Sequence, residues 1–314
     1  MIYTCTINPS LDYYLKIENE FKLGEINRLD SEKYAAGGKG VNVSIVLNNL
    51  MIPSVTIGFL GGFTREYYLS YLKEYTYIMP LFTQIEGNTR INIKLSYKGD
   101  NGLNKEMDLN AHGPKISDNE FEKFKKRIER IDNGDIFVLS GNVQEELFEK
   151  MVAILSDLSL RGVKIILDTN YTLIRECLKL KPLLIRPNME DMEELCDITI
   201  HSEDDLVKAG AALVEAGAKN VLLSLGLDGA LLVCESGAFH SDHIKGNIVS
   251  TTGADDAMVA AYVFDLQRGA DEFEAFRYAC AAGAATEFKN GLATRNEIEE
   301  CYKLVKIERK TINL

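Results

Sequence analysis

Two kinds of segment alternate along most of this chain, and this alternation constrains the fold more than any other feature of the sequence. From residue 54 onward, short apolar runs of strand length alternate with longer segments whose apolar residues recur at helical spacing. Such alternation is typical of parallel sheets, because parallel neighbours need a crossover between them, usually a helix. We therefore predict an α/β fold, with a doubly wound, mostly parallel sheet and helices on both faces.

The predicted elements follow from the length and periodicity of each apolar segment. Strands are expected at 1–7, 55–60, 136–139, 164–167, 183–185, 221–224 and 231–234. Helices are expected at 41–50, 120–130, 145–160, 173–180, 189–195 and 204–216.

Four extended segments do not follow this rule, and they predict a second, smaller sheet. They cover residues 11–17, 29–34, 90–97 and 104–110, and Lys98-Gly99-Asp100-Asn101-Gly102 has the composition of a hairpin turn. We expect one domain over 1–314, with a lid sheet inserted from about 11–36 and 88–112. Because a small sheet is marginally stable alone, we expect a second copy to pack on it and form a homodimer.

The acidic charge of the chain limits its partners. A formal net charge of −12 argues against nucleic acid or an anionic membrane surface, since both bind positive surfaces. No apolar run approaches the roughly 20 residues of a membrane span, and the first residues lack a signal-peptide layout. We therefore expect a cytoplasmic protein, whose six well-separated cysteines stay reduced.

Polar residues follow each predicted parallel strand where it ends. Ligands bind beyond the carboxyl ends of such strands, so these clusters should face one edge of the sheet. Each cluster alone is explained by turn chemistry, but together they predict a binding site. The clusters are Asn8 with Asp12, Gly61-Gly62, Ser140-Gly141-Asn142, Asp168-Thr169-Asn170, Arg186-Pro187-Asn188, and Ser224 to Gly229.

The loop Gly37-Gly38-Lys39-Gly40 resembles phosphate-binding loops only in part. A Walker loop needs glycine at position 33 and serine or threonine at 40, but Lys33 and Gly40 stand there. A dinucleotide fingerprint fails as well, because Val43 replaces its third glycine. What remains is a glycine-lined helix start with one lysine, suited to a small anion. A tight turn with a solvated lysine explains the same composition equally well.

A second helix start lies within Ser250 to Ala261. Thr251 and Thr252 are expected to cap this helix, and its free N–H groups could bind a phosphate. Asp256, one step inside, could then accept a proton from an attacking group. Alternatively, Asp255 and Asp256 only complement the helix dipole.

The sequence as a whole resembles the PfkB/ribokinase family of sugar kinases, and within it the 1-phosphofructokinase and tagatose-6-phosphate kinase group. The resemblance runs nearly end to end. It is carried by residues 6–12 (TINPSLD), 24–28 (GEINR), 37–44 (GGKGVNVS), 58–62 (GFLGG), 89–92 (TRIN), 138–141 (VLSG), 223–226 (LSLG) and 253–256, which match the family's Gly-Ala-Gly-Asp signature.

The resemblance implies a ribokinase-like core, a β-sheet lid that often dimerises, and phosphorylation of a sugar hydroxyl by ATP with Mg²⁺. The expected reaction is conversion of fructose 1-phosphate to fructose 1,6-bisphosphate, with tagatose 6-phosphate as the alternative substrate. A monovalent cation near Ser250 and Gly291 is left open.

The same resemblance assigns roles to residues at matching positions. Asp256 matches the catalytic base, and the N–H groups of Gly253, Ala254, Asp255 and Asp256 match an anion hole. Residues that match the sugar-phosphate site are Asp12, Gly38, Lys39, Asn42, Arg90 and Ser140, with Arg28 joining from a partner's lid. Residues that match the nucleotide side are Arg186, Asn188, Ser224, Gly226 and Gly229, with Asp191 holding the metal through water.

Five features of the sequence depart from the family pattern. Two lie in loops: Asn142-Val143-Gln144 replaces the usual Pro- and Gly-rich loop after Ser140-Gly141, and Arg65 stands where a glycine is common. The other three lie at residues of the expected site. Asp255 stands in place of a glycine, Asp191 in place of a glutamate, and Arg186 in place of a lysine. A carboxylate at 255 would repel a bound phosphate if nothing neutralised it. The departures keep open a second hypothesis, a sugar-phosphate-binding or regulatory protein with impaired catalysis.

Overall fold

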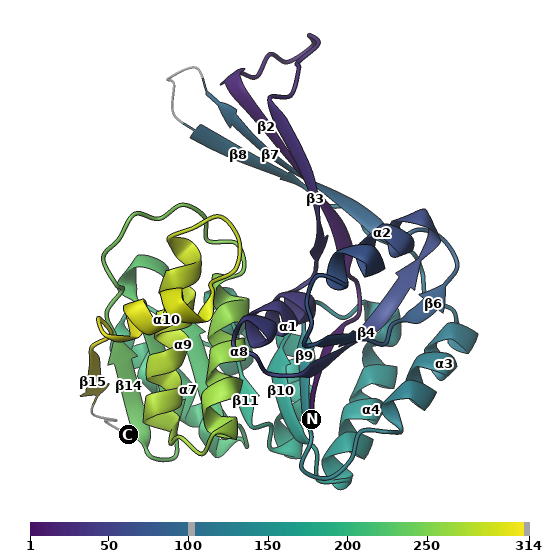
Figure 1. Cartoon of the computed structure of the whole chain (residues 1–314). Coiled ribbons are helices and arrows are strands. Elements are labelled where there is room, and N and C mark those ends of the chain that lie inside the picture. The colour runs from purple at the N-terminus through teal and green to yellow at the C-terminus, as the bar shows by residue number, and fades with distance from the viewer. Residues whose placement is uncertain (100–103, 311–314) are drawn as a thin grey trace.

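The computed structural model describes residues 1–99 and 104–310, and a large mixed sheet forms its centre (Figure 1). The strand order is β15-β14-β13-β12-β11-β10-β9-β1-β4-β5, with β6 also pairing with β4. The strands are β1 (Ile2–Thr6), β4 (Ser54–Gly61), β5 (Ile78–Pro80), β6 (Thr83–Ile85), β9 (Ile136–Ser140), β10 (Lys164–Asp168), β11 (Leu184–Ile185), β12 (Asn220–Ser224), β13 (Ala230–Cys234), β14 (Gly237–Ser241) and β15 (Ile307–Lys310).

Most of this sheet is parallel, as predicted. Every neighbouring pair from β5 through β4, β1, β9, β10 and β11 to β12 is parallel, whereas β13, β14 and β15 continue the sheet in antiparallel pairs. The carboxyl ends of the parallel strands therefore lie along one edge, where the polar clusters follow them.

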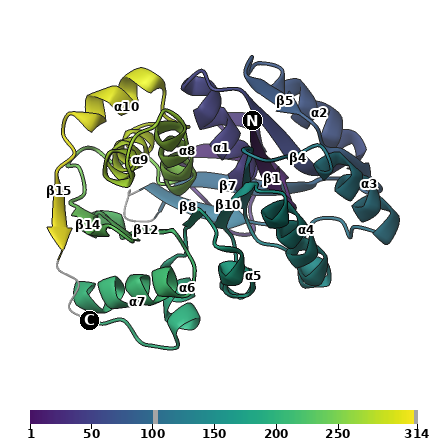
Figure 2. The ribbon, with the colours of Figure 1, turned by 90° about the horizontal axis from the view of Figure 1, so that it is seen from below.

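Helices cover both faces of the sheet, which confirms the doubly wound arrangement (Figure 2). One face carries α1 (Lys39–Asn49), α8 (Ala254–Gln267), α9 (Glu272–Glu287) and α10 (Arg295–Tyr302), and α2 (Gly62–Leu72) packs beside α1. The other face carries α3 (Asp118–Ile128), α4 (Phe148–Leu160), α5 (Tyr171–Cys177), α6 (Met189–Cys196) and α7 (Glu203–Glu215).

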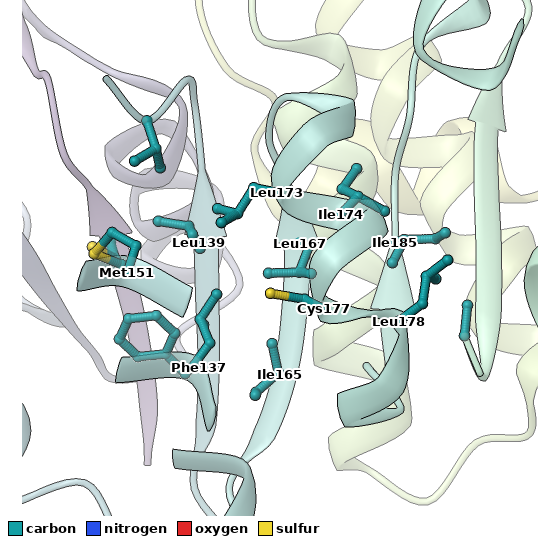
Figure 3. Close-up of a cluster of buried hydrophobic side chains, with 14 of the residues drawn as sticks. Phe137, Leu139, Met151, Ile165, Leu167, Leu173, Ile174, Cys177, Leu178 and Ile185 are labelled. Carbon is teal, nitrogen blue, oxygen red and sulfur yellow. The ribbon is translucent and has the colours of Figure 1, made fainter. Parts of the chain in front are cut away.

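Alternate side chains of each central strand pack into the two hydrophobic cores on opposite faces of the sheet. On β9, Phe137 and Leu139 pack among the helices around α4, whereas Ile136 and Val138 face the opposite core. Figure 3 shows Phe137 and Leu139 beside Met151 of α4. Since successive side chains point to opposite faces, a strand buried on both must be apolar throughout. Truncating Phe137 to alanine would cost about 3–5 kcal/mol of stability.

The smaller sheet projects from the main body and has the order β3-β2-β7-β8 (Figure 1). It contains β2 (Ser10–Glu20), β3 (Ser31–Gly37), β7 (Arg90–Lys98) and β8 (Asn104–Leu109). Strands β7 and β8 pair antiparallel, as a hairpin requires. Part of the predicted turn, residues 100–102, lies outside the described residues.

Several elements escaped prediction, α9 above all. Nearly all of its central residues are buried, from Ala275 to Thr286, so it lacks the polar stripe that marks an amphipathic helix. The other unpredicted elements are α2, α10, β5, β6, β14 and β15. Within 1–99 and 104–310, no helix combines the length and apolarity needed to cross a bilayer.

Candidate active site

Helix α8 begins at the strand-end edge with an uncapped N-terminus. Its N-cap is Gly253, with φ 82°, and no described side chain accepts a hydrogen bond from this end. The prediction that Thr251 and Thr252 cap the helix is therefore wrong: the chain enters through a left-handed glycine, which has no side chain to offer. A Cβ on Gly253 would also lie 2.5 Å from Cδ2 of Leu292. The N–H of Ala254 donates to the carbonyl of Thr251 at 3.2 Å, whereas no described side chain caps the N–H groups of Asp255 and Asp256, which remain available to an anion.

Asp256 is buried in the first turn of α8, with only 4% of its surface exposed. Asn42 of α1 donates a 2.8 Å hydrogen bond from Nδ2 to Oδ2 of Asp256, whereas Oδ1 has no partner in the described structure. Burial, together with the charge of Asp168, raises the pKa of Asp256 to about 7, although Lys39 and the Asn42 hydrogen bond oppose the shift. A carboxylate with this pKa can accept a proton near neutral pH.

Asp168, at the end of β10, contacts two cations, Lys39 and Arg186. Its Oδ1 lies 3.2 Å from Nζ of Lys39, and it accepts hydrogen bonds from Arg186. Its Oδ2 is buried without a hydrogen-bond partner among the described residues. The sequence placed Asp168 in a strand-end cluster but assigned it no role, although its position after a parallel strand was the available signal.

Arg186, at the end of β11, contacts two carboxylates at once. Its Nε and Nη2 lie 2.7 and 2.5 Å from Oδ1 of Asp168, and its Nη1 lies 3.1 Å from Oδ2 of Asp255. Burial opposes the charge of the guanidinium, but Asp168 and Asp255 outweigh it and raise the pKa of Arg186. The two departures at 186 and 255 are therefore ion-pair partners.

Lys39 is the first residue of α1, and backbone crowding fixes the loop before it. Gly38 has φ 134°, and a Cβ there would lie 2.8 Å from Thr6. A Cβ on Gly40 would lie 2.8 Å from the carbonyl oxygen of Cys5. The glycines let this loop lie directly against the end of β1, which brings the half-exposed Lys39 to the same edge as Asp168.

Asp12 lies on β2, where the smaller sheet joins the main body. Its Oδ1 accepts hydrogen bonds from Ser10 at 2.7 Å and from Asn92 at 3.1 Å. Burial raises the pKa of Asp12, against the effects of these hydrogen bonds and of nearby Lys94 and Arg90. Asp12 is thus a fixed, partly desolvated acceptor of the kind that binds a hydroxyl.

Arg90, the first residue of β7, is half-buried and held by the backbone. Nη1 donates to the carbonyl of Ala111 at 3.0 Å, and Nη2 donates to the carbonyl of Asn8 at 2.9 Å. Burial lowers the pKa of Arg90, with Asp12 opposing the shift. Its Nε is buried and has no hydrogen-bond partner among the described residues.

The structure places two further predicted site residues, Ser140 and Arg28, in different parts of the fold. Ser140, at the end of β9, is fully buried and its Oγ lacks a hydrogen-bond partner in the described structure. Arg28 is exposed on the loop from 21 to 30 that joins β2 and β3, at the far end of the smaller sheet (Figure 1). The fold of one chain therefore does not bring Arg28 to the edge where Asp256 lies.

Ser224, Gly226 and Gly229 line a narrow pocket of about 40 Å³ whose other wall is formed by α8 and α9. His243 and Glu287, which the sequence analysis did not single out, also line this pocket. Nε2 of His243 and Oε2 of Glu287 are 2.8 Å apart. A wider groove of about 700 Å³ lies between β6 and α3, but no predicted site residue lines it. Of these two hollows, only the narrow pocket is therefore lined by residues of the predicted site.

Asn188 and Asp191 form a reciprocal capping box at the start of α6. Asp191 N donates to Oδ1 of Asn188 at 2.7 Å, and Asn188 N donates to Oδ2 of Asp191 at 3.2 Å. The structure thus gives both residues a capping function.

The geometry agrees with the proteins that this chain resembles. The profile of the pfkB family of carbohydrate kinases matches residues 7–299. The chain belongs to this family. It is 37% identical to a 1-phosphofructokinase of Borreliella burgdorferi over 98% of both chains, and 31% identical to a D-tagatose-1-phosphate kinase of Bacillus licheniformis over 98% of this chain and 99% of the relative.

A solved structure shows the same fold as this PfkB kinase. Phosphofructokinase-2 of Escherichia coli, in complex with substrates and products, superposes with a TM-score of 0.90 at 26% identity, covering 96% of this chain and 98% of the other. PfkB kinases use ATP, and the chain is accordingly a phosphotransferase with a sugar hydroxyl as acceptor.

The donors present suit a magnesium ion held largely by water and phosphate oxygens. Within the described residues, no three His, Cys, Asp or Glu side chains converge to enclose a metal. Mg²⁺ usually binds through one or two carboxylates, several waters and substrate phosphates. Asp168, with its unpartnered Oδ2, fits this pattern, and Asp191 presents a second carboxylate from the start of α6.

Proposed function

We propose that this PfkB kinase phosphorylates a ketohexose monophosphate that carries its phosphate on C1. Fructose 1-phosphate is the first candidate, and fructose 1,6-bisphosphate is its product. The names of the two relatives support this choice, because one is a 1-phosphofructokinase and the other is a D-tagatose-1-phosphate kinase. D-tagatose 1-phosphate is accordingly the second candidate, and tagatose 6-phosphate stays an alternative for the assay.

The observation that carries the proposal is the burial of Asp256 at an uncapped helix start. Its pKa of about 7 and its free Oδ1 suit a general base that takes the proton from the attacking hydroxyl. The adjacent N–H groups, from Gly253 to Asp256, would donate to the charge that develops on the transferred phosphoryl group. Proton acceptance and anion stabilisation would thus meet at the first turn of α8.

The substrate side follows from the cationic and hydroxyl-binding groups at the same edge. We propose that Asp12 and Asn42 bind sugar hydroxyls and that Lys39 and Arg90 hold the substrate's own phosphate. Gly38 would let the sugar approach the backbone, and Ser140 would offer its unpartnered hydroxyl to the substrate. This local set of cations explains how a chain of net charge −12 could bind a phosphorylated sugar.

The nucleotide side would lie along the pocket of Ser224, Gly226 and Gly229. Ligand pockets usually exceed about 300 Å³, so we expect its two walls to separate when ATP binds. Asn188 would border the phosphates, and Asp168 and Asp191 would hold Mg²⁺ through water. When bound, ATP supplies the phosphoryl group and Mg²⁺ supplies positive charge at the phosphates. The E. coli phosphofructokinase-2 has also been crystallised with potassium, which makes a monovalent cation near Ser250 and Gly291 worth testing.

The smaller sheet would serve as a lid over the sugar site and as a dimer interface. Leu23 and Ile26 are 91% and 90% exposed on its terminal loop, and Tyr13 stacks on Tyr34 with ring centroids 4.2 Å apart. The inhibited E. coli phosphofructokinase-2 is a tetramer, so assembly occurs in the family. A dimer would let Arg28 reach the partner's sugar phosphate.

A coupled ADP-release assay tests the proposed reaction. Fructose 1-phosphate, D-tagatose 1-phosphate, tagatose 6-phosphate and fructose 6-phosphate serve as acceptors for wild type and Asp256→Asn. We expect turnover of fructose 1-phosphate, reduced at least about 1000-fold in Asp256→Asn. Absence of turnover with every sugar in the wild type would refute the kinase.

A sugar-phosphate-binding or regulatory protein with impaired catalysis is the second candidate, and Asp255 is the observation that favours it. In that case wild type binds fructose 1-phosphate in calorimetry without releasing ADP, and Asp255→Gly gains turnover. Wild-type turnover that Asp256→Asn abolishes and Asp255→Gly barely changes would exclude this candidate.

A further inference from the structure

We infer that Arg186 is a positioning residue that neutralises Asp255 and holds its carboxylate away from the anion-binding start of α8. The inference rests on the proposed function, since it explains how phosphate could bind beside an acid. It concerns the connection between β11, β10 and α8, three elements that Arg186 links through two carboxylates.

The arrangement around Arg186 is built rather than incidental. Its side chain is only 5% exposed and contacts both Asp168, which is 1% exposed, and Asp255. Asp255 is 42% exposed and would otherwise be free to turn toward any ligand at the helix start. The 3.1 Å contact with Arg186 gives this carboxylate a fixed partner on the sheet side. A phosphate at the first turn would then meet N–H groups beside a paired carboxylate.

The charge balance of the site depends on this one guanidinium. Asp168, Asp255 and Asp256 face two cations, Lys39 and Arg186, in the same network. Lys39 is 44% exposed and contacts only Asp168 among these acids, so it cannot replace Arg186 beside Asp255. Losing the arginine would leave an excess of negative charge where the nucleotide phosphates must lie.

Arginine suits this position because the bridge needs several donors in a fixed plane. Nε and Nη2 engage Asp168 while Nη1 engages Asp255. A lysine ammonium is a single point charge on a flexible stem and would satisfy one carboxylate at a time. Arg186→Lys therefore keeps the charge and removes the bridge, which makes it the informative substitution.

A double-mutant cycle on Arg186→Lys and Asp255→Asn tests the inference. KM for ATP and kcat are measured at saturating fructose 1-phosphate, and the affinity for a non-hydrolysable ATP analogue is measured by calorimetry. We expect Arg186→Lys to weaken binding of the ATP analogue and raise KM for ATP, each about tenfold, when Asp255 is present. In the Asp255→Asn background the same substitution should change either quantity by at most about twofold. Arg295→Lys, which alters an exposed pair with Glu299, is the matched control.

An equal loss from Arg186→Lys in both backgrounds would overturn the inference, because Arg186 would then act on the nucleotide without Asp255. A wild-type protein that turns over no sugar phosphate would refute the proposed function instead. Calorimetry with the non-hydrolysable ATP analogue still reports the coupling in that case, so the two failures are distinguishable. Thermal unfolding of all four proteins identifies any variant that fails to fold.

Discussion

The amide of Asn42 donates a 2.8 Å hydrogen bond to the carboxylate of Asp256, and the two residues lie 214 positions apart in the chain. Asn42 belongs to α1 and Asp256 to the first turn of α8, and these two helices pack against each other on one face of the sheet. The contact fixes the orientation of the proposed base, leaving Oδ1 without a protein partner. It also stabilises the charged form of a carboxylate that burial would otherwise keep protonated.

The first prediction concerns the pH dependence of catalysis. A general base works only when deprotonated, so kcat/KM should fall as pH drops below about 7, the pKa of Asp256. Asn42→Leu removes a hydrogen bond that lowers this pKa and should move the acidic limb to higher pH. Rate profiles from pH 5.5 to about 9 check both statements. If the acidic limb of the kcat/KM profile lies at the same pH in Asn42→Leu as in wild type, a group other than Asp256 controls that limb.

The second prediction concerns stability. The folded-state pKa of Asp256 is raised, so the folded protein binds more protons than the unfolded chain between about pH 4 and 7. The contribution of Asp256 to wild-type stability should therefore decline across this window as pH rises. Asp256→Asn lacks the charge and should be more stable than wild type at pH 8, by up to a few kcal/mol, with a smaller difference at pH 5. Denaturant unfolding at both pH values measures this difference, and a pH-independent difference would contradict the argument.

The third prediction concerns Arg90. Arg90→Lys cannot make both backbone contacts with one ammonium group, so the position of the cation should be lost and KM for the sugar phosphate should rise about tenfold or more. KM for ATP should change little, because the proposed role is on the sugar side. Steady-state kinetics with each substrate varied provide the measurement, with Arg295→Lys as control. Equal increases in both KM values would instead indicate a general disturbance where β7 begins.

The fourth prediction concerns assembly through the smaller sheet. Ile26→Glu places a charge on its exposed apolar loop and should convert a dimer to monomers at micromolar concentration. Leu160→Glu is the matched control, since Leu160 is 88% exposed at the end of α4, away from that sheet. Sedimentation velocity distinguishes the states. A wild-type monomer, or a dimer that survives Ile26→Glu, would refute this interface.

The fold was largely predictable because its strongest signals are local. Strands such as Ile136–Ser140 are apolar on both faces, and helices such as α7 carry a clear apolar stripe with a capping serine. Helix α9 shows the limit of this reasoning. Its burial on nearly all sides comes from packing between α8, α10 and the sheet, and no pattern in Glu272–Glu287 distinguishes that environment.

The candidate site was predictable as a location and as a list of residue types. Parallel strands end at one edge, so Asp168 and Arg186 had to lie near each other once the sheet was parallel. The pairing of side chains was not predictable. Asp255 was expected to repel phosphate, whereas the structure gives it Arg186 as a partner at 3.1 Å.

By itself the sequence determined which segments form strands and helices, which ends of the strands carry polar residues, and which family the motifs resemble. These properties depend on periodicity and backbone chemistry within short segments. Only the tertiary structure decided which charges neutralise one another, which acid is buried, and which helix start stays uncapped. Those outcomes depend on distances between residues such as Asn42 and Asp256. Coulombic and desolvation energies change steeply over a few ångströms, a scale that the order of residues does not specify.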